Sequence, residues 1–247
     1  MELSMLAKEK KIVLLIGSTA VSGVNLEKEK IVFATILKEE KIMLGKNNWL
    51  PFLLVFLMMA SACSVSKNPL RKEVKNLQKG LIKDDTSYIY ALPYEEGKTF
   101  RVIQGYFRGF THRERAALDF NMKRGTRITA VREGVVVRAK EDGTLGGLKK
   151  KFRSHGNNIV IQHDDGTRAG YWHLQTDGAL VNVGDTVRKG QVIALSGKTG
   201  FAFIPHLHFL VWRSGEGQWR QVATRFQTSK GVRYLKGMKK YRNSKPE

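Results

Sequence analysis

Histidine is the residue type with the clearest chemical potential in this 247-residue chain, which holds six of them. His206 and His208 are separated by one residue in the apolar segment HLHF. Alternate residues of a strand point to the same face, so a strand here places the two imidazoles side by side. Neutral imidazoles are common zinc ligands. An H-x-H pair also suits a plain polar strand face, so a metal site needs further ligands elsewhere in the chain.

Two other apolar segments supply such ligands. Asp119 stands between two apolar residues in ALDF, a place that indicates a paired, hydrogen-bonded or metal-bound carboxylate. His112 precedes it in THRERAALDF, and His173 lies among apolar neighbours in YWHL. A catalytic zinc site needs three protein ligands and one open position for water. These residues, together with His206 and His208, are enough for both metal binding and acid–base work.

The order of these motifs resembles that of the lysostaphin-type (LytM-like) zinc endopeptidases, which are peptidoglycan hydrolases. The resemblance spans about residues 100–213 and extends to the segments GTRITAVREGVVV, GNNIVIQHDDG, VNVGDTVRKGQVIALSGKTG and PHLHFLVW. It implies that the chain is a zinc metalloendopeptidase that hydrolyses peptide bonds of bacterial peptidoglycan. Which bond it cuts is not readable from these segments.

The resemblance also implies a role for each candidate residue. His112, Asp119 and His208 would bind Zn²⁺, whereas His173 and His206 would be the catalytic histidines outside the ligand set. Six residues separate His112 from Asp119, more than in the commonest form of the family, which predicts a longer loop between these two ligands.

The chemistry follows from those roles. Zinc lowers the pKa of its bound water toward about 7 and polarises the scissile carbonyl. A histidine with an ordinary pKa of about 6.5 can take the water's proton and pass it to the leaving amine. His173 and His206 share this role, and which of them is the base stays open. Tyr106 is either an oxyanion donor or an ordinary strand residue. We expect His155 in an exposed loop and His163 in a turn.

Cys63 is the sole cysteine, which excludes an intrachain disulfide and a cysteine-based metal site. It follows the apolar run WLPFLLVFLMMASA at 49–62, which is short for a spanning helix but fits the h-region of a signal peptide. The junction resembles the lipobox of bacterial lipoproteins, although Ala60 stands where a larger aliphatic residue is usual. The resemblance implies a lipid on Cys63 and anchoring at a membrane outside the cytoplasm, in the cell envelope. Ordinary secretion after A-x-A and a retained short anchor are the alternatives.

Signal peptides rarely begin as late as residue 49. The segment MLGKNNW, starting at Met43, has the basic character of an n-region. We therefore expect translation to start at Met43 and the signal peptide to occupy 43–62. Residues 1–42 are then untranslated, or else form a long cytoplasmic leader.

The remaining chain divides by composition into three parts. Residues 63–85 carry the cysteine and then a polar, Lys-rich linker or short helix. From 86 to 228, short apolar or alternating runs are separated by turn residues, and no long amphipathic helix interrupts them. This pattern predicts a single all-β domain, an antiparallel β-sandwich or barrel-sandwich. The last residues, 229–247, are rich in Lys and Arg and predict a loosely ordered basic tail.

The formal net charge of +21 favours polyanionic surroundings. The chain lacks a zinc finger, a Gly-rich phosphate loop and a stacking-aromatic motif, so nucleic acid is not an expected partner. We expect the basic residues of the linker, the LKKKFRSH loop and the tail to draw the domain to an anionic envelope surface. The alternative is a solvated basic surface without a partner. The sequence does not predict the oligomeric state.

Two other function classes remain to be weighed. VNVGDTVRKGQVIAL also resembles the hairpins of biotinyl and lipoyl carrier domains, but no lysine is displayed at a hairpin tip as such carriers require. Some relatives of the zinc peptidases are catalytically silent and regulate cell-wall amidases by binding them. Every expected ligand position is filled in this chain, which favours the enzyme. The zinc content of the purified chain discriminates between the two.

Overall fold

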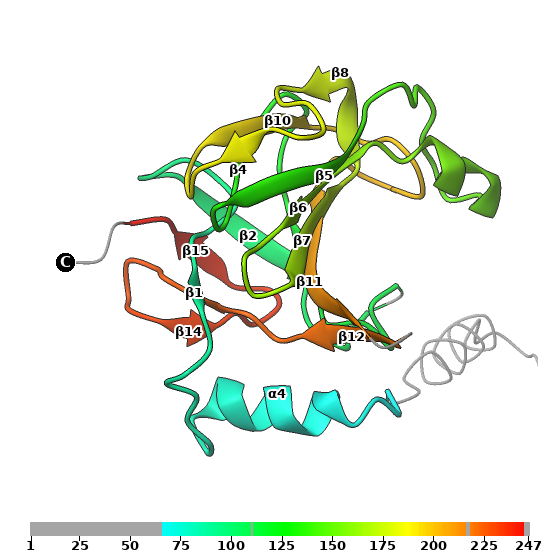
Figure 1. The fold of residues 1–247 in the computed structure, drawn as a ribbon. Helices are drawn as coiled ribbons and strands as arrows, with labels where there is room; N and C mark the ends of the chain where they lie inside the picture. Colours follow the sequence, from blue (N-terminus) through cyan, green and yellow to red (C-terminus); the bar gives the residue numbers. More distant parts are fainter. Residues whose placement is uncertain (1–65, 110, 216–217, 245–247) are drawn as a thin grey trace, which may run out of the picture. The chain divides into compact units, whose positions relative to one another are not determined.

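A computed structural model describes residues 66–109, 111–215 and 218–244, drawn in colour in Figure 1. The predicted signal peptide at 43–62, Cys63 and residues 1–42 lie outside the described residues. Within the described part, no helix is long and apolar enough to cross a membrane. The structural account therefore concerns the predicted domain and the segments that flank it.

Strands dominate the described residues, so the predicted all-β class is confirmed. The helical elements are the α-helix α4 (Leu70–Lys79) and the 3-10 helix η1 (Lys150–His155). The strands are β1 (Ile89–Tyr90), β2 (Thr99–Gln104), β3 (Ala117–Phe120), β4 (Arg127–Thr129), β5 (Gly134–Lys140), β6 (Asn158–Gln162), β7 (Thr167–Trp172), β8 (Leu174–Ala179), β9 (Thr186–Val187), β10 (Val192–Ser196), β11 (Leu207–Gly215), β12 (Gln218–Val222), β13 (Arg225–Phe226), β14 (Arg233–Tyr234) and β15 (Lys240–Arg242).

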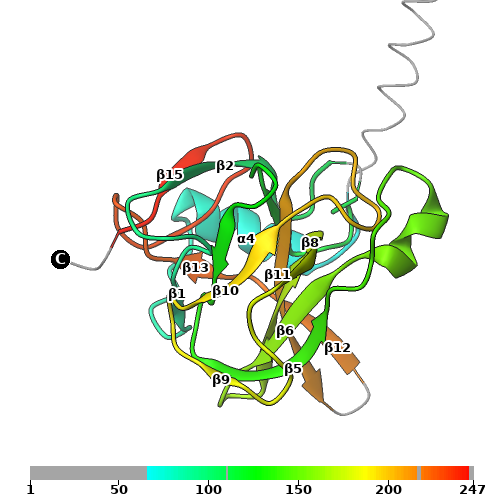
Figure 2. The same cartoon turned by 90° about the horizontal axis from the view of Figure 1, so that it is seen from above.

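The largest sheet runs in the order β15-β2-β3-β11-β7-β6-β5-β9, with antiparallel pairing throughout, and β12 adds to β11. Figure 2 shows β15 and β2 at one end of this sheet and β5 and β9 at the other. Two smaller sheets, β4-β10-β8 and β1-β13-β14, complete the domain. Within the described strands, β1 and β13 form a parallel pair. Strand β11, at the centre of the large sheet, is the element on which the site depends.

Alternation along β11 divides its side chains between two apolar clusters. Leu207 and Phe209 belong to the main hydrophobic core. Leu210 and Trp212 belong to a second, smaller cluster on the other face. Because strand residues two apart share a face, His208 lies on the face of this second cluster. The main core thus fixes the position of β11, and His208 lies on its opposite face.

Turn chemistry connects the central strands as the sequence predicts. The β6–β7 hairpin turns at Asp164-Asp165-Gly166, where Gly166 has a φ of 77°. A side chain at this backbone conformation would clash with its own carbonyl, so glycine is the residue that fits. The hairpin sets β7 antiparallel to β6 and brings its last residue, Trp172, beside β11.

The predicted linker contains an ordered helix. Helix α4 ends at Lys79 and is capped by Gly80, which has a φ of 73° and whose N–H points to the carbonyls of Asn76 and Leu77, a common C-terminal cap. Val74 is buried in the main core, and Gln78 donates from Nε2 to the Leu235 carbonyl at 2.5 Å. In Figure 1 the helix lies below β14 and β12.

The prediction of a loosely ordered tail at 229–247 was wrong for its described part. Strand β15 pairs with β2, and β14 pairs with β13. Leu235 is fully buried in the main core, and the hydroxyl of Tyr94 donates to the Tyr241 carbonyl at 2.8 Å. The few apolar residues among the lysines therefore anchor the segment, which extends the folded domain beyond the predicted boundary at 228.

Candidate active site

Three neighbouring strands bring the site together. On β11, His208 stands opposite Asp119 of β3 on one side and Trp172 of β7 on the other. Leu118 and Phe120, the neighbours of Asp119, point into the main core. Alternation therefore turns Asp119 to the opposite face, where it meets His208. The apolar neighbours that make Asp119 conspicuous in the sequence are the residues that orient it.

His112, Asp119 and His208 converge on one point. The Oδ1 atom of Asp119 lies 2.8 Å from Nδ1 of His208 and 3.1 Å from Nε2 of His112. The two imidazole nitrogens are 3.0 Å apart. All three residues are buried. One ligand atom from each forms a cluster in which every pair lies within 4.8 Å, so these residues make a candidate metal centre.

The donor set suits zinc. Two imidazole nitrogens and one carboxylate oxygen are among the combinations that hold catalytic zinc. Zinc–ligand distances of about 2.0–2.1 Å in a tetrahedron place ligand atoms about 3.3 Å apart, so the triangle has to open by only a few tenths of an ångström. Burial would raise the pKa of Asp119, but hydrogen bonds from His112 and His208 hold it well below its usual range. Burial lowers the pKa of His208, which favours the neutral, ligating imidazole.

The loop between β2 and β3 carries His112. Its Nδ1 atom lies 3.4 Å from the carbonyl of Gly105, which leaves Nε2 directed at the other two ligands. A Cβ on Gly105 would come within 2.9 Å of the Gly237 backbone nitrogen. The turn between β14 and β15 therefore backs the loop that positions this ligand.

His173 lies between β7 and β8 in an unusual backbone conformation, with a φ of 65°. Its Nδ1 atom is 2.8 Å from the carbonyl of Thr199. A carbonyl only accepts, so Nδ1 carries the proton and Nε2 keeps a free lone pair in the neutral ring. Burial, reinforced by His206 and His208, lowers the pKa of His173 to about 3. The ring is therefore neutral at ordinary pH, with Nε2 unprotonated.

His206 mirrors this arrangement just before β11. Its Nδ1 atom lies 2.8 Å from the Ile204 carbonyl, which again assigns the proton to Nδ1 and the lone pair to Nε2. That Nε2 atom is 3.8 Å from Oδ1 of Asp119. The rings of His173 and His206 are 4.7 Å apart, centre to centre, and that of His208 is 5.7 Å from His173. The five predicted site residues thus lie together.

A buried network supports His173 from behind. The backbone N–H of Asn157 donates to Oγ1 of Thr199 at 3.0 Å, and that hydroxyl donates to the Leu174 carbonyl at 2.7 Å. The side-chain amide of Asn157 also bonds to the carbonyls of Glu141 and Gly143. These contacts fix the Thr199 carbonyl that orients His173. Asn157 and Thr199 occur in the motifs GNN and SGKTG, but their supporting role was not predicted.

The other candidates from the sequence lie outside this cluster. The hydroxyl of Tyr106, just after β2, is buried and bonds to the carbonyl and hydroxyl of Thr224, so of the two alternatives the structure does not support the oxyanion donor. His155 ends η1 and is half-buried, not fully exposed. His163 lies in the β6–β7 turn, as predicted, where its Nδ1 donates to the Glu133 carbonyl at 2.7 Å.

Comparison with known proteins assigns the domain. Residues 113–219 match Peptidase family M23. The chain contains a Peptidase family M23 domain. The match begins one residue after His112 and includes the other four site residues. The predicted resemblance to lysostaphin-type peptidases is thereby confirmed.

Lysostaphin from Staphylococcus simulans is 36% identical over 92 residues, covering 37% of this chain and 17% of lysostaphin. The solved catalytic domain of that protein is 31% identical, with a TM-score of 0.37, over 50% of this chain and 87% of the domain. Peptidoglycan DD-endopeptidase ShyA from Vibrio cholerae is 38% identical over 91 residues, covering 37% of this chain and 18% of ShyA.

Murein hydrolase activator EnvC from Escherichia coli is 33% identical over 105 residues, which cover 42% of this chain and 24% of EnvC. The chain thus matches about a quarter or less of the length of each of these three curated relatives. The relatives of this chain thus include both peptidases and a hydrolase activator.

Proposed function

We propose that the chain is a zinc-dependent endopeptidase that hydrolyses peptide bonds of bacterial peptidoglycan. The observation that carries the proposal is the convergence of His112, Asp119 and His208 beside two further histidines whose Nε2 atoms are free to accept a proton. A site built only for structure needs no such acceptors beside the metal. The M23 domain and its peptidoglycan-hydrolysing relatives support the choice of substrate.

His112, Asp119 and His208 would hold the ion. When bound there, zinc supplies a Lewis acid that activates water and polarises a carbonyl. The buried Asp119 carboxylate remains ionised, since both neighbouring imidazoles hydrogen-bond to it. Its negative charge would offset part of the charge of a bound metal ion.

His173 and His206 act as the general base and general acid. Each has its Nδ1–H fixed on a backbone carbonyl, which leaves Nε2 unprotonated, and the two ring centres lie 4.7 Å apart. One Nε2 takes the proton of the attacking water, and a protonated Nε2 then delivers it to the amine that leaves. General acid–base assistance of this kind contributes about 10²–10⁴-fold to a rate.

The test is digestion of purified peptidoglycan by the full chain loaded with zinc, followed by mass spectrometry of the released fragments. The proposal predicts fragments with a new amino and a new carboxyl terminus within the peptides and intact glycan. A matched sample of His173→Asn protein controls for contaminating hydrolases. Fragments cut in the glycan, or no fragments from a zinc-loaded chain, would refute it.

A second candidate is a catalytically silent activator of murein hydrolases, because EnvC is among the relatives. The intact histidine and aspartate set favours the enzyme over this alternative. A chain that binds no zinc and cuts no peptidoglycan, but raises the activity of an added amidase, would establish the activator.

We also propose a cell-envelope location, with lipid on Cys63. The apolar run at 49–62 and the small residues before the cysteine support it. Labelled fatty acid supplied to expressing bacteria should enter the wild-type protein and not Cys63→Ser. Equal labelling of both would refute lipidation at this cysteine.

A further inference from the structure

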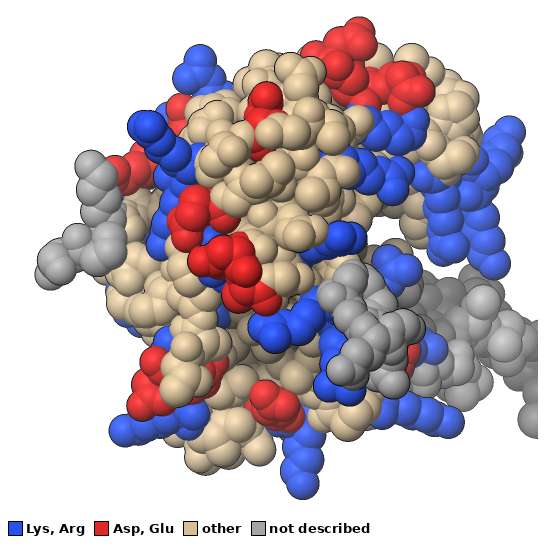
Figure 3. Space-filling view, viewed as in Figure 1, with Lys and Arg blue, Asp and Glu red and all other residues tan. Residues whose placement is uncertain are grey.

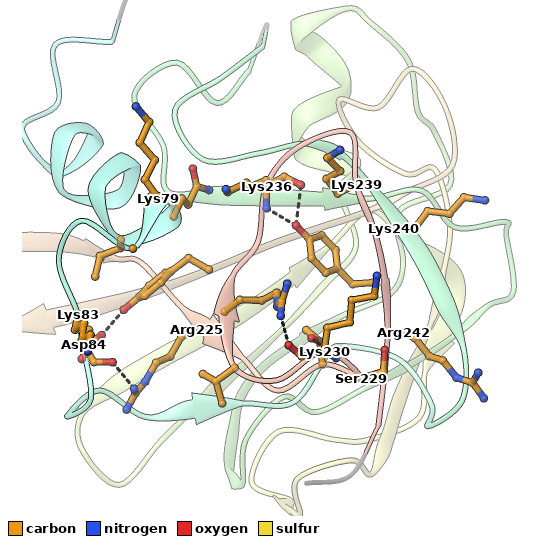
Figure 4. A pocket seen from close by; sticks show the side chains of 18 of the residues that line it. Lys79, Lys83, Asp84, Arg225, Ser229, Lys230, Lys236, Lys239, Lys240 and Arg242 are labelled. Carbon is orange, nitrogen blue, oxygen red and sulfur yellow. Dashed lines mark hydrogen bonds between the residues drawn. The ribbon is translucent and has the colours of Figure 1, made fainter. Parts of the chain in front are cut away.

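A second feature, a strongly basic pocket, lies apart from the histidines. It has a volume of about 930 Å³ and is formed by the end of α4, the segment after it, and the strands β13 to β15. None of the five site residues lines it. Figure 4 shows cationic side chains around this hollow. The lysines that line it are Lys79, Lys83, Lys230, Lys236, Lys239 and Lys240.

The pocket joins two segments that are far apart in sequence. Lys79 and Lys83 come from the predicted linker, whereas Lys230 to Lys240 come from the predicted tail. All six lysines are exposed. Pairing of β15 with β2, and packing of α4 on β14, bring the two groups together. The fold thus concentrates charge that the sequence shows only as two separate basic stretches.

The acidic groups in the wall do not neutralise these lysines. Asp84 accepts hydrogen bonds from the hydroxyls of Ser87 and Tyr234 and from the Ser87 backbone N–H. Burial would raise its pKa, but these bonds lower it below its usual range, so the carboxylate is charged. Its oxygens are occupied by hydrogen bonds within the pocket wall. Asp85 is the other carboxylate that lines the pocket, and within the described residues none of the six lysines forms an ion pair with Asp or Glu. The pocket therefore keeps a surplus of positive charge.

The one buried arginine of the pocket has a structural role. Arg225 donates from Nε to the Ser87 carbonyl at 2.8 Å, and its other nitrogens reach the carbonyls of Asp84 and Ser87. It does not form a buried cage for a single small anion. The available cations are the six exposed lysines spread along the hollow, together with the exposed Arg233 and Arg242. The lysine ammonium groups act as point charges and bind phosphates at variable spacing.

We propose that this pocket binds successive phosphate groups of a linear polyanionic polymer. Such a chain can lie along the hollow and meet lysines of both segments, 79–83 and 230–240, whereas a flat lipid surface reaches only the rim. Binding would release counterions and relieve repulsion among the clustered lysines. It would hold the domain to a phosphate-bearing component of its surroundings, independently of the metal site and of the proposed peptidase activity.

The experiment measures binding of fluorescently labelled inorganic polyphosphate to the full chain by anisotropy over a range of salt. The pocket variant is Lys236→Gln/Lys239→Gln/Lys240→Gln. The control is Lys149→Gln/Lys150→Gln/Lys151→Gln, which removes the same charge around η1, where Figure 3 shows another group of cations at the edge of the molecule. Unfolding temperatures of both variants establish that each is folded.

The proposal predicts that the pocket variant binds at least about tenfold more weakly, and that its slope of log K against log salt is shallower by about 2, because each phosphate contact to a single-stranded polyanion contributes about 0.7. The control should lose much less affinity. Equal losses in the two variants would overturn the site in favour of general charge attraction. Equal affinity for polyglutamate would overturn the preference for phosphate. Tighter binding to anionic phospholipid vesicles, lost in the same pocket variant, would assign the surface to a membrane.

Discussion

His173 combines a strained backbone with a proposed catalytic role, so replacing it by asparagine should separate stability from activity. The residue has a φ of 65° and fixes Nδ1 on the Thr199 carbonyl at 2.8 Å. Asparagine tolerates this backbone region better than most residues, and its amide nitrogen occupies a position close to that of Nδ1. It has no counterpart of Nε2. His173→Asn therefore keeps the orienting bond and removes the proton acceptor.

The expected change in stability is the balance of two terms. The left-handed conformation costs a typical side chain about 1–2 kcal/mol, part of which asparagine recovers. Loss of the ring contact with His206, whose centre is 4.7 Å away, costs about 0.5–1.5 kcal/mol. We therefore expect the free energy of unfolding of His173→Asn to stay within about 1 kcal/mol of wild type. The cleavage rate should fall by about 10²–10⁴-fold.

His206→Asn is the matched control. It also keeps an amide in place of Nδ1 and loses Nε2, but it has no positive φ to relieve. It should be the less stable of the two by about 1 kcal/mol. Denaturant unfolding, zinc content by elemental mass spectrometry and cleavage of a soluble peptidoglycan fragment give the three quantities for each protein.

Two results would refute this reasoning. A rate for His173→Asn within about tenfold of wild type would remove His173 from proton transfer. Loss of the bound zinc would reassign His173 as a ligand.

Three further predictions follow from the ligands and their surroundings. His208→Ala should abolish stable zinc binding, as equilibrium dialysis would detect; full activity in that variant would contradict the ligand set. Gly105→Ala should lower zinc affinity by about 10–100-fold, because its Cβ would meet the Gly237 nitrogen at 2.9 Å and displace the carbonyl that orients His112. An unchanged zinc affinity would show that the position of this carbonyl does not control metal binding. Burial first, and then His206 and His208, lower the pKa of His173 to about 3, so the unfolded chain binds more protons than the folded chain between pH 3 and about 6.5. The metal-free protein should therefore lose stability as the pH falls through that window, and His173→Asn should lose it less steeply. Equal slopes of unfolding free energy against pH, measured by urea titration, would refute the assignment.

The central strands could be predicted because their side chains obey a simple period. ALDF and HLHF alternate between the core and the site face, so Asp119 and His208 could be placed on strands before their contact was known. Pairing of β3 with β11 then supplied the geometry. The strand positions of Asp119 and His208 were therefore accessible from the period, whereas the roles of the five candidate residues come from the family resemblance.

Other features depend on tertiary pairing or on the backbone. Strands β14 and β15 are very short and rich in lysine and arginine. Strand β15 is ordered by pairing with β2, more than a hundred residues away in sequence, and burial of Leu235 anchors the segment between the two strands. The carbonyls of Thr199 and Ile204 orient His173 and His206, but a backbone atom leaves no residue-type signal. Likewise, the Thr224 carbonyl that occupies the Tyr106 hydroxyl lies 118 residues away in sequence and leaves no signal near Tyr106.

The most direct test of the central claim is a zinc titration of the chelated full chain, with bound metal and peptidoglycan peptide cleavage measured on the same samples. The account predicts that the cleavage rate rises in proportion to bound zinc and levels off at one ion per chain, because the described residues offer one His112–Asp119–His208 cluster. Asp119→Ala should show neither tight binding nor cleavage over the same range. Cleavage by the metal-free chain, or one tightly bound ion without any cleavage, would contradict it.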